Sequence, residues 1–213
     1  MSAKAQGFAT FVLRVRASRP DPKVLRTVEE VDRSVYVASE DVGRAYSDHM
    51  LPLACGQATE RLDDAVMLLS ALDVRPHHRV LELGTGSGFV TELLSRLAAK
   101  VVTVDRYRRL LSAARERHAK RGLSNVTYLQ RDATALPDLD GPFDRIVSSV
   151  AFEAPPRAFI EHLVADGVLV APIGPPDGPQ TISWLGKVGA RFERREAGEG
   201  WFPPAETGVA HAT

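Results

Sequence analysis

The sequence predicts an α/β protein whose mostly parallel sheet ends in an antiparallel hairpin. Strand-like and helix-like segments alternate from residue 79 onward, and a glycine-rich turn joins the first of these strands to the helix that follows it. Near the C-terminus, residues 180–188 and 191–196 flank Gly189 in a pattern typical of a hairpin. Alternation of this kind builds a parallel sheet with helices on both faces.

The individual elements follow from hydrophobic spacing. Residues 21–31 are predicted to form a helix, because apolar residues recur at helical intervals after Asp21 as N-cap and Pro22 at the first helical position. A second helix, 65–72, ends before Pro76. The later segments are predicted as strands 79–83, 101–105, 125–129, 143–149 and 167–173, and as helices 87–98, 107–120 and 156–164. We expect one compact unit, with residues 1–57 as an N-terminal helical extension and 58–213 as the main domain.

The composition restricts the partners that the protein is expected to bind and the cell compartment in which it is expected. The formal net charge is zero and the pI is near 7.0, which gives no global attraction to nucleic acid or to anionic membranes. The one cysteine, Cys55, fits a reducing cytoplasm, and no Cys/His spacing typical of a metal site is present. No apolar run approaches the roughly 20 residues of a membrane span. Arg14 and Arg16 interrupt or end the apolar stretch 8–15, which makes it a poor signal peptide. We therefore expect a soluble, cytoplasmic protein.

The most informative motif is the run from Glu82 to Gly88, Glu-Leu-Gly-Thr-Gly-Ser-Gly. A strand that ends in such a turn and re-enters a helix brings backbone N–H groups close to a ligand. Glu82 lies two residues before Gly84, where it would repel a phosphate and attract a cationic group. S-adenosylmethionine has an ammonium, a sulfonium and no phosphate, so the motif favours this cofactor over the alternatives, another nucleotide or a purely structural turn.

A second acid supports a nucleoside site. Asp105 ends the next predicted strand, about 20 residues past the glycine turn, where a carboxylate accepts hydrogen bonds from both ribose hydroxyls. Ligands of open sheets bind at the carboxyl ends of the strands, and Glu82, Asp105, Asp132 and Ser149 are all predicted to lie there.

The chain resembles the protein-L-isoaspartate O-methyltransferase family along nearly its whole length. The resemblance is carried by the following segments: 21–25, 41–53, Gly56-Gln57, 80–88, 122–126 with Asp132, 142–146, 166–174 and Phe202-Pro203. Many methyltransferases share the glycine motif, but Gly56-Gln57 together with Phe202-Pro203 is far more specific. The resemblance implies a Rossmann-like fold of the class I S-adenosylmethionine-dependent methyltransferases.

The resemblance also implies an activity, a cofactor and site residues. The reaction is methyl transfer from S-adenosylmethionine, which leaves S-adenosylhomocysteine, to the free carboxylate of an isoaspartyl residue in a damaged protein or peptide. We expect a monomer, with neither nucleic acid nor membrane as a partner and with no metal. In the family, the counterpart of Asp132 binds the adenine amino group; a turn or cap role is the alternative. The implied cofactor-binding residues are Glu82, Gly84, Thr85, Gly86, Ser87, Gly88, Asp105, Arg106, Asp132 and Ala133.

One loop departs from the family pattern. The family's Gly-Gln-Thr-Ile-Ser is followed by a residue and a proline, whereas this chain has Glu60 in place of the serine and Leu62 in place of the proline. Thr59 and Glu60 are the candidate catalytic residues. Two carboxylates about 4 Å apart repel by roughly 4 kcal/mol at an effective dielectric near 20, so an ionised Glu60 would disfavour an isoaspartyl carboxylate. It would suit a cation, or act as a base for a neutral nucleophile, unless Arg61 offsets it or Glu60 turns to solvent.

Several other residues leave alternatives open. Ser148 and Ser149 are expected either to line the methyl-transfer cleft or to serve as turn residues. Seven basic residues between 106 and 121 indicate the solvated face of a helix, with RNA binding as the alternative. The His77-His78 pair lacks a spaced metal-binding partner. Residues 201–204 either close over the substrate or anchor the tail.

These observations leave three functions. The leading one is isoaspartyl O-methylation. A divergent family member would instead methylate another acceptor, namely a small molecule, a modified peptide or RNA. The third is a protein that binds the cofactor without turnover.

Overall fold

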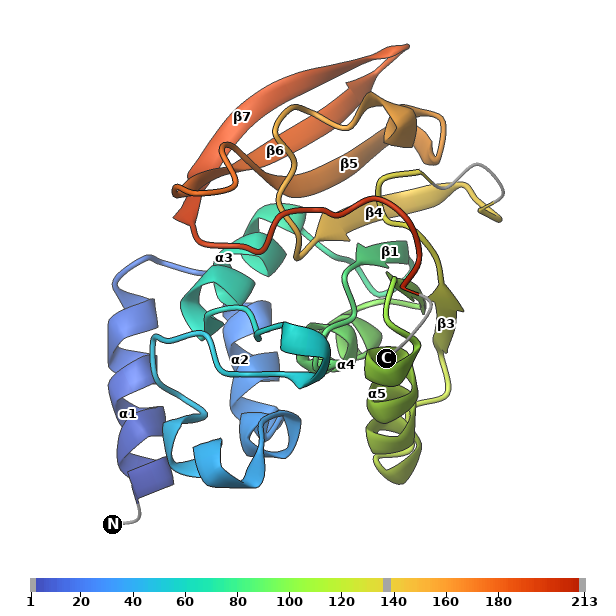
Figure 1. Ribbon diagram of the computed structural model, residues 1–213. Coiled ribbons are helices and arrows are strands. Elements are labelled where there is room, and N and C mark those ends of the chain that lie inside the picture. Colours follow the sequence, from blue (N-terminus) through green and yellow to red (C-terminus); the bar gives the residue numbers. More distant parts are fainter. Residues whose placement is uncertain (1–2, 136–138, 211–213) are drawn as a thin grey trace.

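A seven-stranded sheet forms the centre of the molecule in the computed structural model, which describes residues 3–135 and 139–210 (Figure 1). The strand order is β3-β2-β1-β4-β5-β6-β7. The first five strands are parallel, and β6 and β7 extend the sheet as an antiparallel hairpin, as predicted. The strands are β1 (Arg79–Leu83), β2 (Lys100–Asp105), β3 (Val126–Gln130), β4 (Phe143–Ser148), β5 (Leu163–Ile173), β6 (Gln180–Val188) and β7 (Arg191–Gly200).

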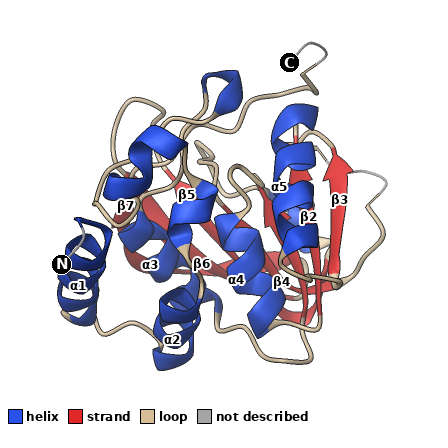
Figure 2. Ribbon diagram, turned by 90° about the horizontal axis from the view of Figure 1, so that it is seen from below, coloured by secondary structure: helices blue, strands red, loops and turns tan. Residues whose placement is uncertain are grey.

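The α-helices of the described residues lie together on one face of the sheet, where Figure 2 shows them in front of the strands. The prediction of helices on both faces is therefore wrong. The α-helices are α1 (Ala3–Arg16), α2 (Pro22–Glu30), α3 (Leu62–Leu72), α4 (Phe89–Leu97) and α5 (Arg108–Lys120). Short 3-10 helices are η1 (Arg33–Tyr36), η2 (Ser39–Arg44), η3 (Ala54–Gly56) and η4 (Arg157–Ile160).

Alternation along the strands creates two hydrophobic cores. In β1, Val80 packs with the residues of α1 to α4 on the helical face, whereas Leu81 and Leu83 belong to the core on the opposite face. That second core is closed by Phe159 of η4 and by loop residues such as Phe152, in place of long helices. Because successive strand residues point to opposite faces, β1 is buried on both sides, as expected for a central parallel strand.

The predicted helix 156–164 is wrong for most of its length. Only the 3-10 helix η4 forms there, after Pro156 as its N-cap, and β5 already begins at Leu163. Leu163 pairs with Phe143 of β4, and the Phe143 N–H donates to the His162 carbonyl at 2.7 Å. Backbone groups that a helix would have paired internally are therefore hydrogen-bonded to a neighbouring strand. A register irregularity separates the Phe143–Leu163 pair from the pairing of Arg145 with Val168.

The first helix, α1, was not predicted. It buries Phe11 and Val15, and Arg14 donates two hydrogen bonds to the Asp63 carboxylate, at 2.6 and 2.8 Å. These contacts with distant residues stabilise a segment whose own apolar pattern is weak. By contrast α2 begins as predicted, because the Asp21 side chain accepts a hydrogen bond from the Lys23 N–H at 2.7 Å.

None of the helices in the described ranges combines the length and the apolar character of a membrane span.

Candidate active site

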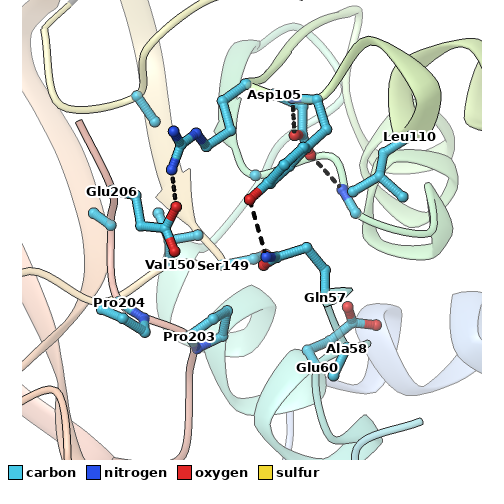
Figure 3. Close-up of a pocket in the computed structure, with 16 residues that line it drawn as sticks. Gln57, Ala58, Glu60, Asp105, Leu110, Ser149, Val150, Pro203, Pro204 and Glu206 are labelled. Atoms are coloured by element: carbon cyan, nitrogen blue, oxygen red, sulfur yellow. Dashed lines mark hydrogen bonds and ion pairs between the residues drawn. The ribbon is translucent and has the colours of Figure 1, made fainter. Parts of the chain in front are cut away.

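A cavity of about 690 Å³, including its open mouth, lies where β1, β2 and β4 end (Figure 3). Figure 3 shows the C-terminal tail along one side of the cavity and Asp105 and Leu110 along another. The lining residues are Gln57, Ala58, Glu60, Gly84, Gly86, Asp105, Arg106, Tyr107, Leu110, Ala133, Ser149, Val150, Pro203, Pro204, Ala205 and Glu206.

The glycine turn forms part of the cavity wall through Gly84 and Gly86. Both have left-handed backbone conformations, with φ of 90° and 52°, which glycine adopts without steric cost. The Gly84 N–H donates to the Val104 carbonyl at 2.9 Å, which ties the turn to β2. The absence of side chains at these two positions leaves the backbone accessible to a ligand.

Other residues of the motif support the turn from behind and are not among the lining residues. Gly88 has φ of 87°, and a Cβ there would approach Ala114 and the His118 ring to 2.9 Å. Thr85 Oγ1 and Thr103 Oγ1 share a hydrogen bond of 2.5 Å, and Ser87 Oγ accepts from the Phe89 N–H at 3.2 Å. The third glycine is thus required for close packing of α4 against α5.

Asp105 and Arg106 lie at the end of β2. The Asp105 carboxylate accepts hydrogen bonds from the Gly86 N–H at 3.0 Å and the Tyr107 N–H at 2.9 Å. Burial raises the pKa of Asp105, while these N–H groups act in the opposite direction. The Arg106 guanidinium forms an ion pair with Glu206, which connects β2 to the tail across the cavity.

Glu82 is completely buried beneath the turn and is not one of the lining residues. Its Oε2 accepts a hydrogen bond from Thr91 Oγ1 at 2.6 Å, while Oε1 lacks a partner among the described residues. Burial raises the pKa of Glu82 to about 8, and the nearby carboxyls of Glu60 and Asp105 add to this shift. This pKa favours the protonated form at pH 7, so Glu82 would contribute a negative potential to this part of the cavity once a cationic ligand displaces its proton.

Glu60 lies in the cavity wall and is 8% exposed, so it does not turn to solvent. Behind it is the buried Arg33 of η1, whose Nη2 donates to the Glu60 main-chain carbonyl at 2.6 Å. The distance from Nη2 to Glu60 Oε1 is 3.9 Å, which is too long for a hydrogen bond, and Oε1 has no other partner in the described chain. The guanidinium also lies over the Phe89 ring, 5.2 Å from its centroid.

The neighbours of Glu60 have structural roles. Thr59 is buried outside the cavity, and its Oγ1 accepts hydrogen bonds from the Leu51 N–H at 3.0 Å and from Arg33 at 3.3 Å. Arg61 lies 3.9 Å from Asp64 in an ion pair. The charge that faces Glu60 is therefore Arg33, and sequence reasoning had considered only Arg61.

The two serines after β4 differ in role. Ser148 Oγ donates to the Val150 carbonyl at 2.6 Å and is a turn residue. Ser149 lines the cavity, and its buried Oγ lacks a partner within the described ranges. In the tail, Phe202 is buried in the helical-face core, while Pro203 and Pro204 line the cavity, so this segment both anchors the tail and covers the site.

Asp132 and Ala133 follow β3, and of the two only Ala133 lines the cavity. Asp132 Oδ1 accepts from the Thr134 N–H at 2.7 Å, and Oδ2 accepts from the Gly208 N–H at 2.6 Å. Burial acts to raise the pKa of Asp132, but a hydrogen bond from the Thr134 hydroxyl at 2.6 Å and these two N–H groups hold it below its ordinary value. Through these hydrogen bonds, Asp132 connects the turn after β3, which contains Ala133, with the C-terminal tail at Gly208.

The basic cluster of residues 106–121 contributes Arg106 to the cavity wall. Elsewhere in the cluster, Arg121 forms an ion pair with the buried Glu92, and Arg117 donates to the Ser87 carbonyl at 3.3 Å. Of the histidine pair, His78 accepts from the Arg75 N–H at 3.1 Å. Within the described residues there is no group of three or more His, Cys, Asp or Glu that could hold a metal ion.

Among the residues of the site that were missed in the sequence, three have polar side chains that link its parts. Tyr107 lines the cavity, and its hydroxyl accepts a hydrogen bond from Gln57 Nε2 at 3.2 Å, which bridges the glycine side to the loop before α3. Glu206 forms an ion pair with Arg106 at the cavity wall, and Arg33 donates a hydrogen bond to the main-chain carbonyl of Glu60. Tyr107 could have been found from its place two residues after Asp105, but no local signal marks the other two.

Fold and site together define a Rossmann-like α/β protein with a small-molecule site at the carboxyl edge of its parallel strands. The family model for protein-L-isoaspartate(D-aspartate) O-methyltransferase matches residues 10–208. A Bradyrhizobium protein-L-isoaspartate O-methyltransferase is 41% identical over 190 residues, covering 89% of this chain and 88% of the relative. The corresponding protein from Dinoroseobacter shibae is 39% identical over 201 residues, covering 94% and 92%.

The fold is also that of a Plasmodium falciparum protein assigned as a protein-L-isoaspartate O-methyltransferase and crystallised with S-adenosyl-L-homocysteine. The TM-score is 0.79 at 18% identity, with 97% of this chain and 99% of the other covered. The chain belongs to the protein-L-isoaspartate(D-aspartate) O-methyltransferase family. The recognition made from the sequence and the predicted fold class are confirmed.

Proposed function

We propose that this protein is an S-adenosylmethionine-dependent methyltransferase that O-methylates the free carboxylate of L-isoaspartyl residues in damaged proteins or peptides. The observation that carries the proposal is the composition of one cavity. The glycine turn and Asp105 form one part of its wall, and the loop that begins Gly56-Gln57 and the Phe202-Pro203 tail supply others. The segments most specific for the family thus meet the segments typical of a nucleoside site.

The residues present fit the cofactor. Gly84 and Gly86 leave room at the turn, Asp105 offers a carboxylate to ribose hydroxyls, and Ala133 provides a small surface where an adenine would lie. When bound, S-adenosylmethionine supplies an electrophilic methyl group. We assign Thr85, Ser87 and Gly88 to shaping the glycine turn, and Glu82 to the charge beneath that turn. Asp132 positions Ala133, and Arg106 pairs with Glu206 at the cavity wall.

The chain itself has to bind the acceptor, orient it and exclude water. A carboxylate is ionised at pH 7 and needs no general base, so alignment is the principal requirement. Pro203 and Pro204 cover the cavity, and Gln57 with Tyr107 spans it. Of the two candidate catalytic residues, Glu60 can contact an acceptor, whereas Thr59 is a positioning residue that holds the loop to Leu51 and Arg33.

The first test is transfer of labelled methyl groups from S-adenosylmethionine to an isoaspartyl peptide, with the aspartyl peptide of the same sequence as control. We expect methylation of the isoaspartyl peptide alone. In an isoaspartyl residue the main chain continues through the side-chain carbonyl and the α-carboxylate is free, and the proposed acceptor is this free carboxylate. Calorimetry with S-adenosylhomocysteine in the same sample shows whether the cofactor site is intact. Equal labelling of both peptides, or none in a protein that binds the cofactor product, would refute the proposed acceptor.

A second prediction concerns Asp105. Substitution Asp105→Asn removes the charge while keeping the shape, and hydrogen bonds to a charged group contribute about 1.5–3 kcal/mol. We expect the affinity for S-adenosylhomocysteine to fall by about ten- to a hundredfold. The matched control is Glu116→Gln, which changes an exposed carboxylate on α5 and should leave affinity unaltered. Unchanged affinity in a folded Asp105→Asn protein would exclude Asp105 from cofactor binding.

A different acceptor is the alternative that one observation favours. Glu60 presents an unpaired carboxyl oxygen in the cavity wall, and an ionised form would attract a cation or take a proton from a neutral nucleophile. The acceptor would then be a small molecule, a modified peptide or RNA, and a protein that binds the cofactor without turnover is the limiting case.

The remaining expectations are proposals of the same kind. We propose a cytoplasmic monomer acting on proteins or peptides, with no nucleic acid partner. The free Cys55 supports the compartment, and the zero net charge supports the absence of a nucleic acid partner. Residues 1–57 are proposed to form an extension that brings the start of the substrate loop to a main domain of residues 58–213.

A further inference from the structure

Three polar atoms of cavity-lining residues lack a hydrogen-bond partner among the described residues: Arg106 Nε, Glu60 Oε1 and Ser149 Oγ. Arg106 is paired with Glu206 through its guanidinium, whereas the side chains of Glu60 and Ser149 are buried, and the ion pair of Glu60 with Arg33 is 3.9 Å long. Glu60 and Ser149 come from separate elements, the loop before α3 and the end of β4. A buried polar atom left unpaired in a native protein is costly, and such an atom on a cavity wall is available to form a hydrogen bond with a bound ligand.

The surroundings of Glu60 contain two acids and one cation. Arg33 faces it from η1, Asp64 from α3 and Glu82 from β1. Arg33 makes its close hydrogen bond to the main-chain carbonyl, and its Nη1 is itself without a partner in the described ranges. Burial raises the pKa of Glu60 and Asp64 acts in the same direction, while Arg33 opposes them. Among the described residues, Glu60 therefore has one ion-pair partner, Arg33 at 3.9 Å, and its Oε1 receives no hydrogen bond.

We propose that Glu60 receives the acceptor carboxylate as a neutral carboxylic acid, whose O–H donates a hydrogen bond to one acceptor oxygen while the Ser149 hydroxyl donates another. This inference rests on the proposed function and names the residues that determine its specificity. A protonated carboxyl is a hydroxyl donor, as is the serine that the family places at this position. The proton on Glu60 comes from solvent, and the acceptor remains ionised because burial makes Glu60 the weaker acid of the two carboxyl groups, by raising its pKa.

Protonation of Glu60 allows the site to bind the carboxylate of its substrate. Two ionised carboxylates in contact at this depth would weaken binding by about a thousandfold. Protonation of Glu60 removes that repulsion, and the contact between the two carboxyl groups becomes a short, charge-assisted hydrogen bond. Isoaspartyl methylation by this chain should therefore decline as pH rises through the titration of Glu60.

The experiment compares the pH dependence of kcat/KM for an isoaspartyl peptide, from pH 5 to 9 at saturating S-adenosylmethionine, in the wild-type protein and the variants Glu60→Gln and Glu60→Ser. Both replacements donate a hydrogen bond without titrating. We expect the wild-type value to fall about tenfold per pH unit above the transition, and the variants to lack this fall, so that the ratio of Glu60→Gln to wild type rises with pH and is close to one on the acid side of the transition. Any slope that remains in the variants reports other groups, Glu82 among them.

A variant of the second donor separates hydrogen bonding from titration. Ser149→Ala should lower kcat/KM about five- to tenfold at every pH, with the pH of the transition unchanged. Calorimetric binding of the isoaspartyl peptide in the presence of S-adenosylhomocysteine, in two buffers of different ionisation enthalpy, should show proton uptake by wild type on the alkaline side of the transition and none by Glu60→Gln.

The possible failures are distinguishable. If the peptide is bound and methylated but wild type and Glu60→Gln have parallel profiles, the role of Glu60 is refuted while the proposed function stands. Lower activity of Glu60→Gln and Glu60→Ser at all pH values, with cofactor binding intact, would identify Glu60 as an ionised group and also refute the inference. If none of the proteins binds or methylates the peptide, the acceptor is wrong and both proposals fall.

Discussion

Replacing Gly88 by alanine should destabilise the protein by about 3 kcal/mol and abolish binding of S-adenosylhomocysteine. The left-handed φ of 87° would cost an L-residue about 1–2 kcal/mol. In addition, the new Cβ would lie 2.9 Å from the Ala114 Cβ and from the His118 ring, and overpacking of this kind costs about 1–3 kcal/mol. Relief requires α4 to move away from α5, which would displace the glycine turn. Urea unfolding measures the first effect and calorimetry the second.

Gly122→Ala is the matched control. Gly122 follows α5, has φ of 73°, and a Cβ there would meet nothing within 4 Å. It therefore carries the backbone strain without the steric contact, and we expect a loss of about 1–2 kcal/mol with unchanged ligand affinity. If the two variants were equally destabilised, close packing at Gly88 would not be the reason for the third glycine.

The sheet was predictable because its signals are local. The boundaries of β1 agree with the predicted 79–83, and β6 agrees with the predicted 180–188. Hydrophobic alternation and flanking turns mark such segments without knowledge of their partners. Failures occurred where distant contacts contribute: Arg14 of α1 pairs with Asp63, and the end of the predicted helix 156–164 instead begins β5, because Leu163 pairs with Phe143 of β4.

The candidate site divides in the same way. Gly84, Gly86 and Asp105 were found from sequence and line the cavity, since a strand–turn–helix motif determines its own geometry. Arg33 was missed because the contact that gives it meaning spans 27 residues, from η1 to the Glu60 carbonyl. For Glu60 the sequence identified the unusual residue and the possible repulsion, but only the fold shows that its side chain is buried beside the cavity.

The second large effect is a pH dependence of stability caused by Glu82. Burial raises its pKa to about 8 in the folded protein, from an ordinary value of 4.5. The folded state therefore binds this proton more tightly than the unfolded state does. The stabilisation is fully present below about pH 4.5 and is lost progressively as pH rises to about 8, with a slope of about 1.4 kcal/mol per pH unit.

Substitution Glu82→Gln removes this titration while its amide oxygen can still accept the hydrogen bond from Thr91. We expect the variant and the wild-type protein to be similarly stable at pH 5, and the variant to be more stable by about 3–5 kcal/mol at pH 8, as measured by urea unfolding without ligand. Glu60 and Asp105, whose pKa values are also raised by burial, and His118, whose pKa burial lowers, titrate in both proteins and largely cancel in the difference.

Glu116→Gln provides the charge-matched control, because it neutralises an exposed carboxylate and should leave the wild-type pH dependence in place. Parallel stability curves for wild type and Glu82→Gln would mean that Glu82 is ionised and satisfied in the folded protein. The expected divergence would mean that the free protein holds a proton under its glycine turn. A cationic ligand would then have to displace that proton, so its binding at neutral pH would be accompanied by proton release.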